Sequence, residues 1–198
     1  MCEDERVDTR GQKPEECQGV GVCDKSSVGE NTSDIVMPMM AREASSLIYN
    51  ASDLLMMSEA LHEARRAYAL DEVPIGCIIT HGGKIIARAA NERTTRGNAL
   101  YHAEILAIDQ ACKAIGDWRL EDCRLYVTIE PCPMCAGAII QARIPVVVYG
   151  AKNPKAGCAG SILNILEEPR FNHQAKVIPG VLEDECAGLM REFFQRFR

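Results

Sequence analysis

The sequence predicts an α/β protein in which helices cover both faces of a mixed sheet of about five strands. The prediction rests first on the order of the segments, which is helix, hairpin, helix, strand, helix, strand, strand and helix. Of the 198 residues, 47% are hydrophobic, which suffices for a buried core between such layers. No internal repeat interrupts this order. We therefore expect a three-layer α/β/α sandwich.

Residues 1–50 are expected to be a flexible acidic extension of the folded domain, which we place at residues 51–198. They hold five Lys or Arg and ten Asp or Glu, and so carry −5 of the formal net charge of −6. They show no hydrophobic period and few aromatic residues. The first ten residues are acidic and lack the apolar region of a signal peptide, and no apolar run approaches the roughly 18 residues of a membrane span. These features predict a cytoplasmic protein without a membrane segment, whose ten Cys are mostly small buried hydrophobic residues.

The folded domain is expected to begin with a helix from about residue 53, because apolar residues recur there at helical spacing. Ser52 or Asp53 is the expected N-cap, and the helix should end before Pro74. His-Gly-Gly at 81–83 predicts a tight turn between two strands of a hairpin.

The remaining segments alternate in type. A helix that ends at Gly116 should be followed by a strand, a short helix and a continuous apolar strand of the kind found in the middle of a sheet. A short helical stretch, a last strand and a final helix are expected after that. The expected ranges are helix 102–115, strand 124–129, helix 133–143, strand 145–150, a short helical stretch after residue 160, strand 175–180 and helix 183–198.

Three side chains with zinc-binding chemistry follow two of the expected strands. His102 offers an imidazole, and Cys132 and Cys135 offer two thiolates. Zinc binds both ligand types, and three protein ligands leave a fourth position for water, as in catalytic sites. A structural four-Cys site would need a second Cys-x-x-Cys, and the chain contains only one. The pattern therefore favours a catalytic zinc site.

The local structure expected around these residues supports that interpretation. Pro133 suits the first position of a helix, so that the sulfurs of Cys132 and Cys135 would lie on one side of the first turn. The positive end of the helix dipole favours both thiols as thiolates. His102 would open the preceding helix. Each ligand follows a loop after a strand, and ligands of open α/β sheets gather at that edge.

Glu104 is two residues beyond His102, a spacing that does not share a face inside a helix. At the start of a helix its carboxylate can still point into the same pocket, where it would take a proton from an activated water and pass it on. His-x-Glu with Pro-Cys-x-x-Cys is the pattern of zinc nucleobase deaminases. A core histidine, a capping Glu and two buried thiols are the structural alternative, and a thioredoxin-like redox motif is another.

Several stretches extend this motif into a resemblance to a known family. They are "EVPIGCII", "HAEILAI", "LYVTIEPCPMCAGAIIQARIPVVVYGAKNPKAGCAGS" and "DECAGLMREFFQRFR". With them, residues from about 53 to 198 resemble the bacterial tRNA-specific adenosine deaminases of the cytidine deaminase-like superfamily. The metal motif alone is shared with cytidine, cytosine and guanine deaminases, and the later stretches favour the tRNA enzymes.

The resemblance implies a cytidine deaminase-like fold and one Zn²⁺ per subunit, held by His102, Cys132 and Cys135. It implies that Glu104 is the catalytic general acid and base in the hydrolysis of the wobble adenosine to inosine. It also implies binding of a tRNA anticodon stem-loop, whose splayed bases are easily extracted, by a homodimer. A deaminase of a free nucleobase, guanine or cytosine, is the alternative function.

The resemblance further suggests four substrate-binding residues. Asn91 corresponds to an Asn that holds the base, although a turn residue at a strand end would look the same. Asn153 stands where family members often have Asp beside the ribose, and it carries no charge there. Lys155 is expected to meet phosphate, or else to be a solvated loop residue. His173 is expected to contact nucleic acid, although a lone His is more often structural.

Overall fold

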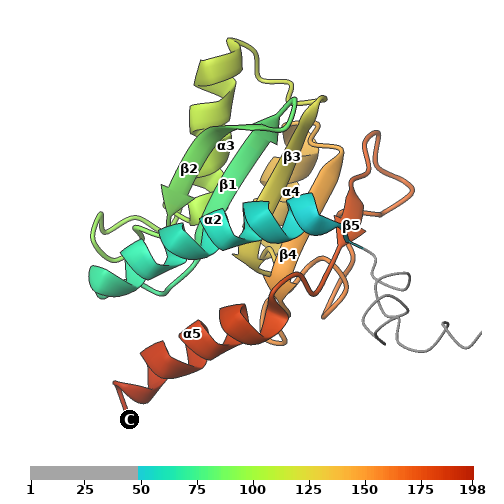
Figure 1. Ribbon diagram of the computed structural model, residues 1–198. Coiled ribbons are helices and arrows are strands. Elements are labelled where there is room, and N and C mark those ends of the chain that lie inside the picture. The colour runs from blue at the N-terminus through green and yellow to red at the C-terminus, as the bar shows by residue number, and fades with distance from the viewer. Residues whose placement is uncertain (1–48) are drawn as a thin grey trace, which may run out of the picture. The chain divides into compact units, whose positions relative to one another are not determined.

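The computed structural model describes residues 49–198 and contains one five-stranded sheet with helices on both faces (Figure 1). The acidic extension expected from the sequence lies outside the described residues, apart from Tyr49 and Asn50. The elements are α2 (Ala51–Ala69), β1 (Gly76–His81), β2 (Lys84–Ala90), α3 (Ala103–Ile115), β3 (Cys123–Ile129), α4 (Pro133–Gln141), β4 (Val146–Ala151), β5 (Lys176–Ile178) and α5 (Glu183–Gln195).

The direction of the strands determines where the loops gather. The strand order is β2-β1-β3-β4-β5, and β1 is antiparallel to both β2 and β3. Strands β3, β4 and β5 pair in parallel. It follows that β2, β3, β4 and β5 all run in one direction and β1 runs in the other. The carboxyl ends of β2, β3 and β4 therefore meet the beginning of β1 at a single edge of the sheet.

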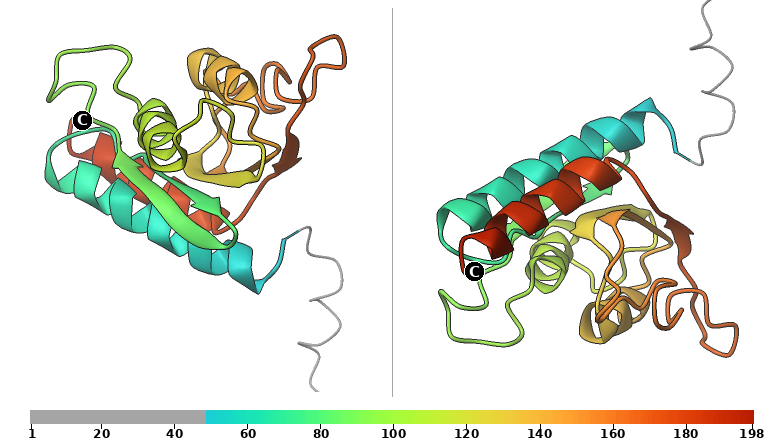
Figure 2. Two further views of the ribbon diagram at one scale, coloured as in Figure 1. Left: turned by 90° about the horizontal axis from the view of Figure 1, so that it is seen from above. Right: turned by 90° about the horizontal axis from the view of Figure 1, so that it is seen from below.

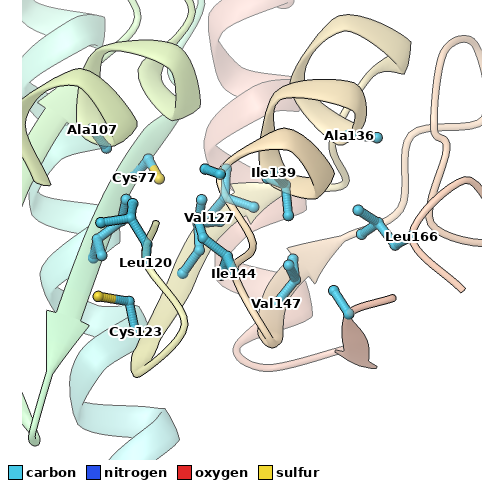
Figure 3. Close-up of a cluster of buried hydrophobic side chains, with 14 of the residues drawn as sticks. Cys77, Ala107, Leu120, Cys123, Val127, Ala136, Ile139, Ile144, Val147 and Leu166 are labelled. Atoms are coloured by element: carbon cyan, nitrogen blue, oxygen red, sulfur yellow. The ribbon is translucent and has the colours of Figure 1, made fainter. Parts of the chain in front are cut away.

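Within residues 49–198, two helices cover each face of the sheet. Helices α2 and α5 lie side by side on one face, and α3 and α4 lie on the other, as both views in Figure 2 show. A separate hydrophobic cluster fills each interface. The cluster beneath α3 and α4 is drawn in Figure 3, where Cys77, Val127 and Val147 from the sheet face Ala107, Ala136 and Ile139 from the helices. The predicted three-layer sandwich with a mixed sheet is confirmed.

The packing of α2 on β1 requires a glycine. A Cβ atom at Gly76 would lie 2.0 Å from the carbonyl oxygen of Ala60 in α2. The amide of Gly76 donates to Thr128 Oγ1 at 3.1 Å and so ties β1 to β3. The start of α2 differs from the expectation: Asn50 is the N-cap, and Asp53 is the third helical residue of a capping box in which each side chain accepts from the other's backbone N–H.

The expected short helical stretch after residue 160 is absent from the described residues. Turns occupy this region, together with one isolated β-bridge between Ala159 and Asn164. The N–H groups of Ala159 and Ser161 donate to a buried carboxylate, described below, and those of Ile162 and Ile165 donate to the carbonyls of Gly157 and Cys158. All seven Cys in residues 49–198 are free thiols, and all but Cys112 and Cys132 are buried. None of the helices in residues 49–198 has the length and apolarity of a membrane span.

Candidate metal centre and active site

His102, Cys132 and Cys135 come together at the edge of the sheet defined above. Their ligand atoms all lie within 4.8 Å of one another. The Nδ1 atom of His102 is 3.7 Å from the Cys132 sulfur and 3.5 Å from the Cys135 sulfur. A tetrahedral zinc with ordinary Zn–S and Zn–N bonds separates sulfur and nitrogen by about 3.6 Å. The three donors therefore fit a zinc ion, and the spacing brings them together as the sequence predicted.

The beginnings of two helices position these donors. His102 is the N-cap of α3, and Cys132 is the N-cap of α4, both in extended backbone conformation. Pro133 occupies the first helical turn, as expected, and Cys135 is buried one turn into α4. Hydrogen bonds from the Cys135 thiol and from His102 lower the pKa of Cys132 to about 4. This shift favours the thiolate of Cys132, whereas the hydrogen bond between the two Cys and burial raise the pKa of Cys135.

Glu104 is buried beside this cluster, in the first turn of α3. Its side chain is 4% exposed, and its Oε2 atom has no hydrogen-bond partner within residues 49–198. Burial is the main cause of a raised pKa for this carboxyl. A buried carboxylate oxygen without a partner is costly, unless a ligand or a proton satisfies it. Its position fits a group that exchanges protons with a water or substrate at the metal.

Asn91 lies beside His102 because the intervening loop closes on itself. The N–H of Glu92 donates to the carbonyl of Tyr101 at 3.0 Å, which brings residue 91 alongside residue 102. The N–H of Asn91 donates to the carbonyl of Ile75 at the start of β1. Asn91 therefore directly follows the last residue of β2, and its backbone lies next to that of His102.

A second loop, residues 152–161 after β4, forms the opposite rim of the site. The carboxylate of Glu130, which is 1% exposed, accepts hydrogen bonds from this loop. Its donors are the backbone N–H groups of Asn153 (3.0 Å), Ala159 (2.9 Å) and Ser161 (2.9 Å) and the Ser161 hydroxyl. A Cβ atom at Gly157 would lie 2.3 Å from Glu130 Oε2. Burial alone would raise the pKa of Glu130, but these hydrogen bonds outweigh it and lower the pKa.

The other expected substrate-binding residues differ in their positions. The side-chain oxygen of Asn153 accepts from the N–H groups of Lys155 (3.3 Å) and Ala156 (3.2 Å), so it shapes the loop. The Lys155 side chain is exposed on the same loop. His173 lies beyond the carboxyl end of α4, where its Nε2 donates to the carbonyl of Ile144 at 2.9 Å. The length of α4, about 13 Å, separates that end from the metal cluster.

Glu72 and Glu130 are buried carboxylates at the site that the sequence did not reveal. Glu72 is fully buried and accepts from the Asn91 side chain at 3.1 Å. Their donors are distant along the chain, so no local pattern identifies them. For Glu130, the sequence does offer one signal. Glu130 directly follows an apolar strand and lies two residues before Cys132, a position that is expected to be buried, and a buried carboxylate needs partners.

Known proteins with similar sequences and structures are deaminases. The family described as MafB19-like deaminase matches residues 51–198. The tRNA-specific adenosine deaminase of Bacillus subtilis is 55% identical over 146 residues, which cover 74% of this chain and 91% of that relative. The chloroplastic tRNA(adenine(34)) deaminase of Arabidopsis thaliana is 43% identical over 159 residues, but these are 12% of its length.

The solved structures agree in fold. One, from a study of A-to-I editing by tRNA:A34 deaminases at the wobble position of transfer RNA, has a TM-score of 0.66 and 43% identity and covers 68% of this chain and 98% of its own. The guanine deaminase of Nitrosomonas europaea has a TM-score of 0.64 at 22% identity, a likeness of fold alone, over 84% of this chain and 98% of its own. The chain therefore belongs to the MafB19-like deaminase family and, among deaminases, to the family of the tRNA-specific adenosine deaminases.

Proposed function

We propose that this chain is a zinc-dependent tRNA deaminase that hydrolyses the wobble adenosine of an anticodon loop to inosine and ammonia. The proposal rests on the cluster of His102, Cys132 and Cys135, which has zinc-like spacing, with the free Oε2 atom of Glu104 buried beside it. The names of the relatives support tRNA as the substrate. One Zn²⁺ per subunit would be held by His102 Nδ1 and the two sulfurs.

Zinc, when bound, supplies a Lewis acid that makes water a nucleophile near neutral pH. Glu104 then handles the protons of the reaction. Its carboxylate takes one proton from the attacking water, whose oxygen bonds to C6 of adenine, and delivers that proton to N1. The second water proton passes through Glu104 to the amine on C6, which leaves as ammonia while C6 becomes a carbonyl. One water is consumed and one ammonia is released, without any redox step.

The loops on both sides of the site support an RNA substrate. The loop after β2 exposes Arg93 and Arg96, and the loop after β4 exposes Lys152 and Lys155. Cations on two sides of a pocket suit a phosphate backbone that enters and leaves it. We propose that Asn91 binds the base, that the loop of Asn153 and Lys155 binds sugar and phosphate, and that His173 contacts RNA outside the pocket.

We also propose that the enzyme is a homodimer in the cytoplasm, with residues 51–198 as the deaminase domain and residues 1–50 as an extension. The family match, which covers residues 51–198, supports this division. Large apolar side chains are exposed on the rim loop after β2 and directly after the rim loop that follows β4. They are Leu100, Ile162 and Leu163, each more than half exposed. A second copy of the chain would cover them. Light scattering of the purified protein should give twice the chain mass.

Incubation with RNA tests the proposed activity. The full chain is mixed with an arginine tRNA anticodon stem-loop that carries a wobble adenosine, and the digested RNA is examined for inosine. Inosine at that position, abolished by a zinc chelator and restored by added zinc, is the expected result. If a zinc-loaded protein makes no inosine but releases ammonia from free guanine or cytosine, the alternative function replaces the proposal.

Glu104→Gln tests the assigned chemistry. The variant should bind one zinc per chain and lose at least about 10³-fold in turnover, within the range for loss of a general acid–base. Asp109→Asn, on an exposed position of the same helix, serves as the matched control and should keep wild-type turnover. Activity of Glu104→Gln within tenfold of wild type would contradict the role of Glu104.

A further inference from the structure

Glu72 is a buried acid at the active edge of the sheet that the proposed chemistry does not use. It lies between α2 and β1 and is 0% exposed. Its Oε2 atom accepts from the Asn91 side-chain nitrogen at 3.1 Å, and its Oε1 atom accepts from the backbone N–H of Thr95. A single carboxylate thus holds both the Asn91 side chain and the loop that follows it. Charged groups are rarely buried without such a specific arrangement.

The contact with Glu72 determines which way the carboxamide of Asn91 faces. A carboxylate only accepts hydrogen bonds, so the Asn91 nitrogen, and not its oxygen, must point to Glu72. The backbone N–H of Asn91 is already bound to Ile75, which holds the residue in place. One N–H of the amide then remains free, together with Oδ1, which makes no hydrogen bond within residues 49–198. When the N–H on the Cβ side makes this bond, the N–H beside Oδ1 stays free and the outer edge presents one donor and one acceptor in a fixed order.

That edge matches one edge of adenine. Adenine presents the N6 amine as a donor next to the N7 acceptor, and a carboxamide can bind the two together. Hypoxanthine presents two acceptors there, so the product keeps only half of the match. We propose that Glu72 is a positioning residue that locks the Asn91 amide so that it pairs with the N6 and N7 atoms of the adenine. This inference rests on the proposed function and on Asn91 as the base-binding residue.

Removal of N7 from the substrate measures this pairing. The probes are two stem-loops with adenosine or 7-deazaadenosine at the wobble position, and the quantity is the ratio of their kcat/KM values. The ratio measured for Asn91→Ala is the baseline, because without the Asn91 amide it reports only the difference in intrinsic reactivity between the two substrates. The wild-type ratio should exceed that baseline by roughly fivefold to tenfold, the value of one hydrogen bond. A wild-type ratio equal to the baseline would overturn the proposal.

Glu72→Gln tests the lock itself. In this variant the glutamine oxygen accepts from the Thr95 N–H and its NH₂ faces Asn91, so the Asn91 amide must turn over to accept from it, and the ratio should fall to the Asn91→Ala baseline. Adding Glu72→Gln to Asn91→Ala should leave the ratio unchanged. Asp53→Asn, which also turns a buried carboxylate into an amide but lies beside the start of β3, at the opposite edge of the sheet, is the matched control and should keep the wild-type ratio. A wild-type ratio in zinc-loaded Glu72→Gln overturns the inference.

A measurement without substitution of Glu72 guards against a variant that fails to fold. In the NMR spectrum of ¹⁵N-labelled wild-type protein, one side-chain N–H of Asn91, assigned with Asn91→Ala, should be protected from exchange. Rapid exchange of both protons would exclude the lock. Failure of the proposed function has a different result: the wild-type protein would then convert neither RNA, whereas failure of this inference alone leaves adenosine deamination intact.

Discussion

Replacement of Glu130 by Gln should destabilise the protein strongly, because every hydrogen bond of this carboxylate uses it as an acceptor. Three backbone N–H groups and the Ser161 hydroxyl donate to it. Gln offers one oxygen and one NH₂ group. The least costly arrangement puts the NH₂ in place of Oε2, where the Ser161 hydroxyl can turn to accept and only the N–H of Asn153 loses its acceptor. The opposite arrangement would leave two N–H groups facing a donor.

The magnitude follows from this least costly arrangement. One buried N–H without an acceptor costs about 1–3 kcal/mol. The two remaining backbone donors, of Ala159 and Ser161, exchange a charged acceptor for a neutral one, at a cost of about 1 kcal/mol each. The free energy of unfolding should therefore fall by about 3–5 kcal/mol, a large part of the 5–15 kcal/mol typical of a domain.

Urea unfolding of the zinc-loaded protein at pH 7 measures this loss. The matched control is Glu168→Gln at the surface. Hydrogen bonds from Arg170 lower the pKa of Glu168 to about 2, but Arg170 is 85% exposed and solvent screens such pairs. The control should therefore unfold as the wild type does. A loss below about 1 kcal/mol in Glu130→Gln, the lower limit for one unpaired buried group, would refute the reasoning.

The remaining predictions concern pH, packing and metal. Hydrogen bonds lower the pKa of Glu130 in the folded state, so its contribution to the free energy of unfolding is complete above its unfolded pKa of about 4.3 and is lost as the pH falls through its folded pKa. Below about pH 4.3, the stability of the wild type should therefore fall more steeply than that of Glu130→Gln. Gly76→Ala should cost about 3 kcal/mol in urea unfolding because its Cβ would strike Ala60, whereas Gly137→Ala in α4, with no atom within 4 Å, should be neutral or stabilising. A chelator should lower the melting temperature and abolish deamination, and added zinc should restore both.

Much of the fold was predictable because hydrophobic residues recur with one period in helices and with another in strands. The strands and helices on either side of the hairpin agree with the sequence to within a few residues, since the core-facing residues set the pattern. The start of α2 was wrong by two residues because Ser52 and Asp53 have capping chemistry equal to that of Asn50. The helical stretch expected after residue 160 was wrong: the N–H of Ser161 donates to Glu130, and the N–H groups of Ile162 and Ile165 donate to the carbonyls of Gly157 and Cys158, so that the chain forms turns instead.

The cluster of His102, Cys132 and Cys135 could be predicted because the sequence shows both the residue types that bind zinc and their spacing. A His, two Cys and a Pro at the right spacing place three donors at two helix starts, and the structure brings these donors together. Glu72 and Glu130 could not be predicted in this way, since a Glu in a sequence looks the same whether it is solvated or buried. Only the fold shows that Glu72 meets Asn91, 19 residues away, and that Glu130 meets Asn153, 23 residues away.

Glu72 and Glu130 each hold a loop at the edge of the open site. The rim loops after β2 and β4 must keep one surface free for the substrate, so apolar packing cannot hold them from both sides. A carboxylate beneath each loop accepts its backbone N–H groups from the core side and leaves the outer surface free. Because β1 is antiparallel to its neighbours, its first residues reach the same edge as the ends of β2 and β3, and this brings Glu72 and Glu130 to opposite rims. Substitution of Glu72 should therefore impair the choice of base before it impairs the binding of zinc.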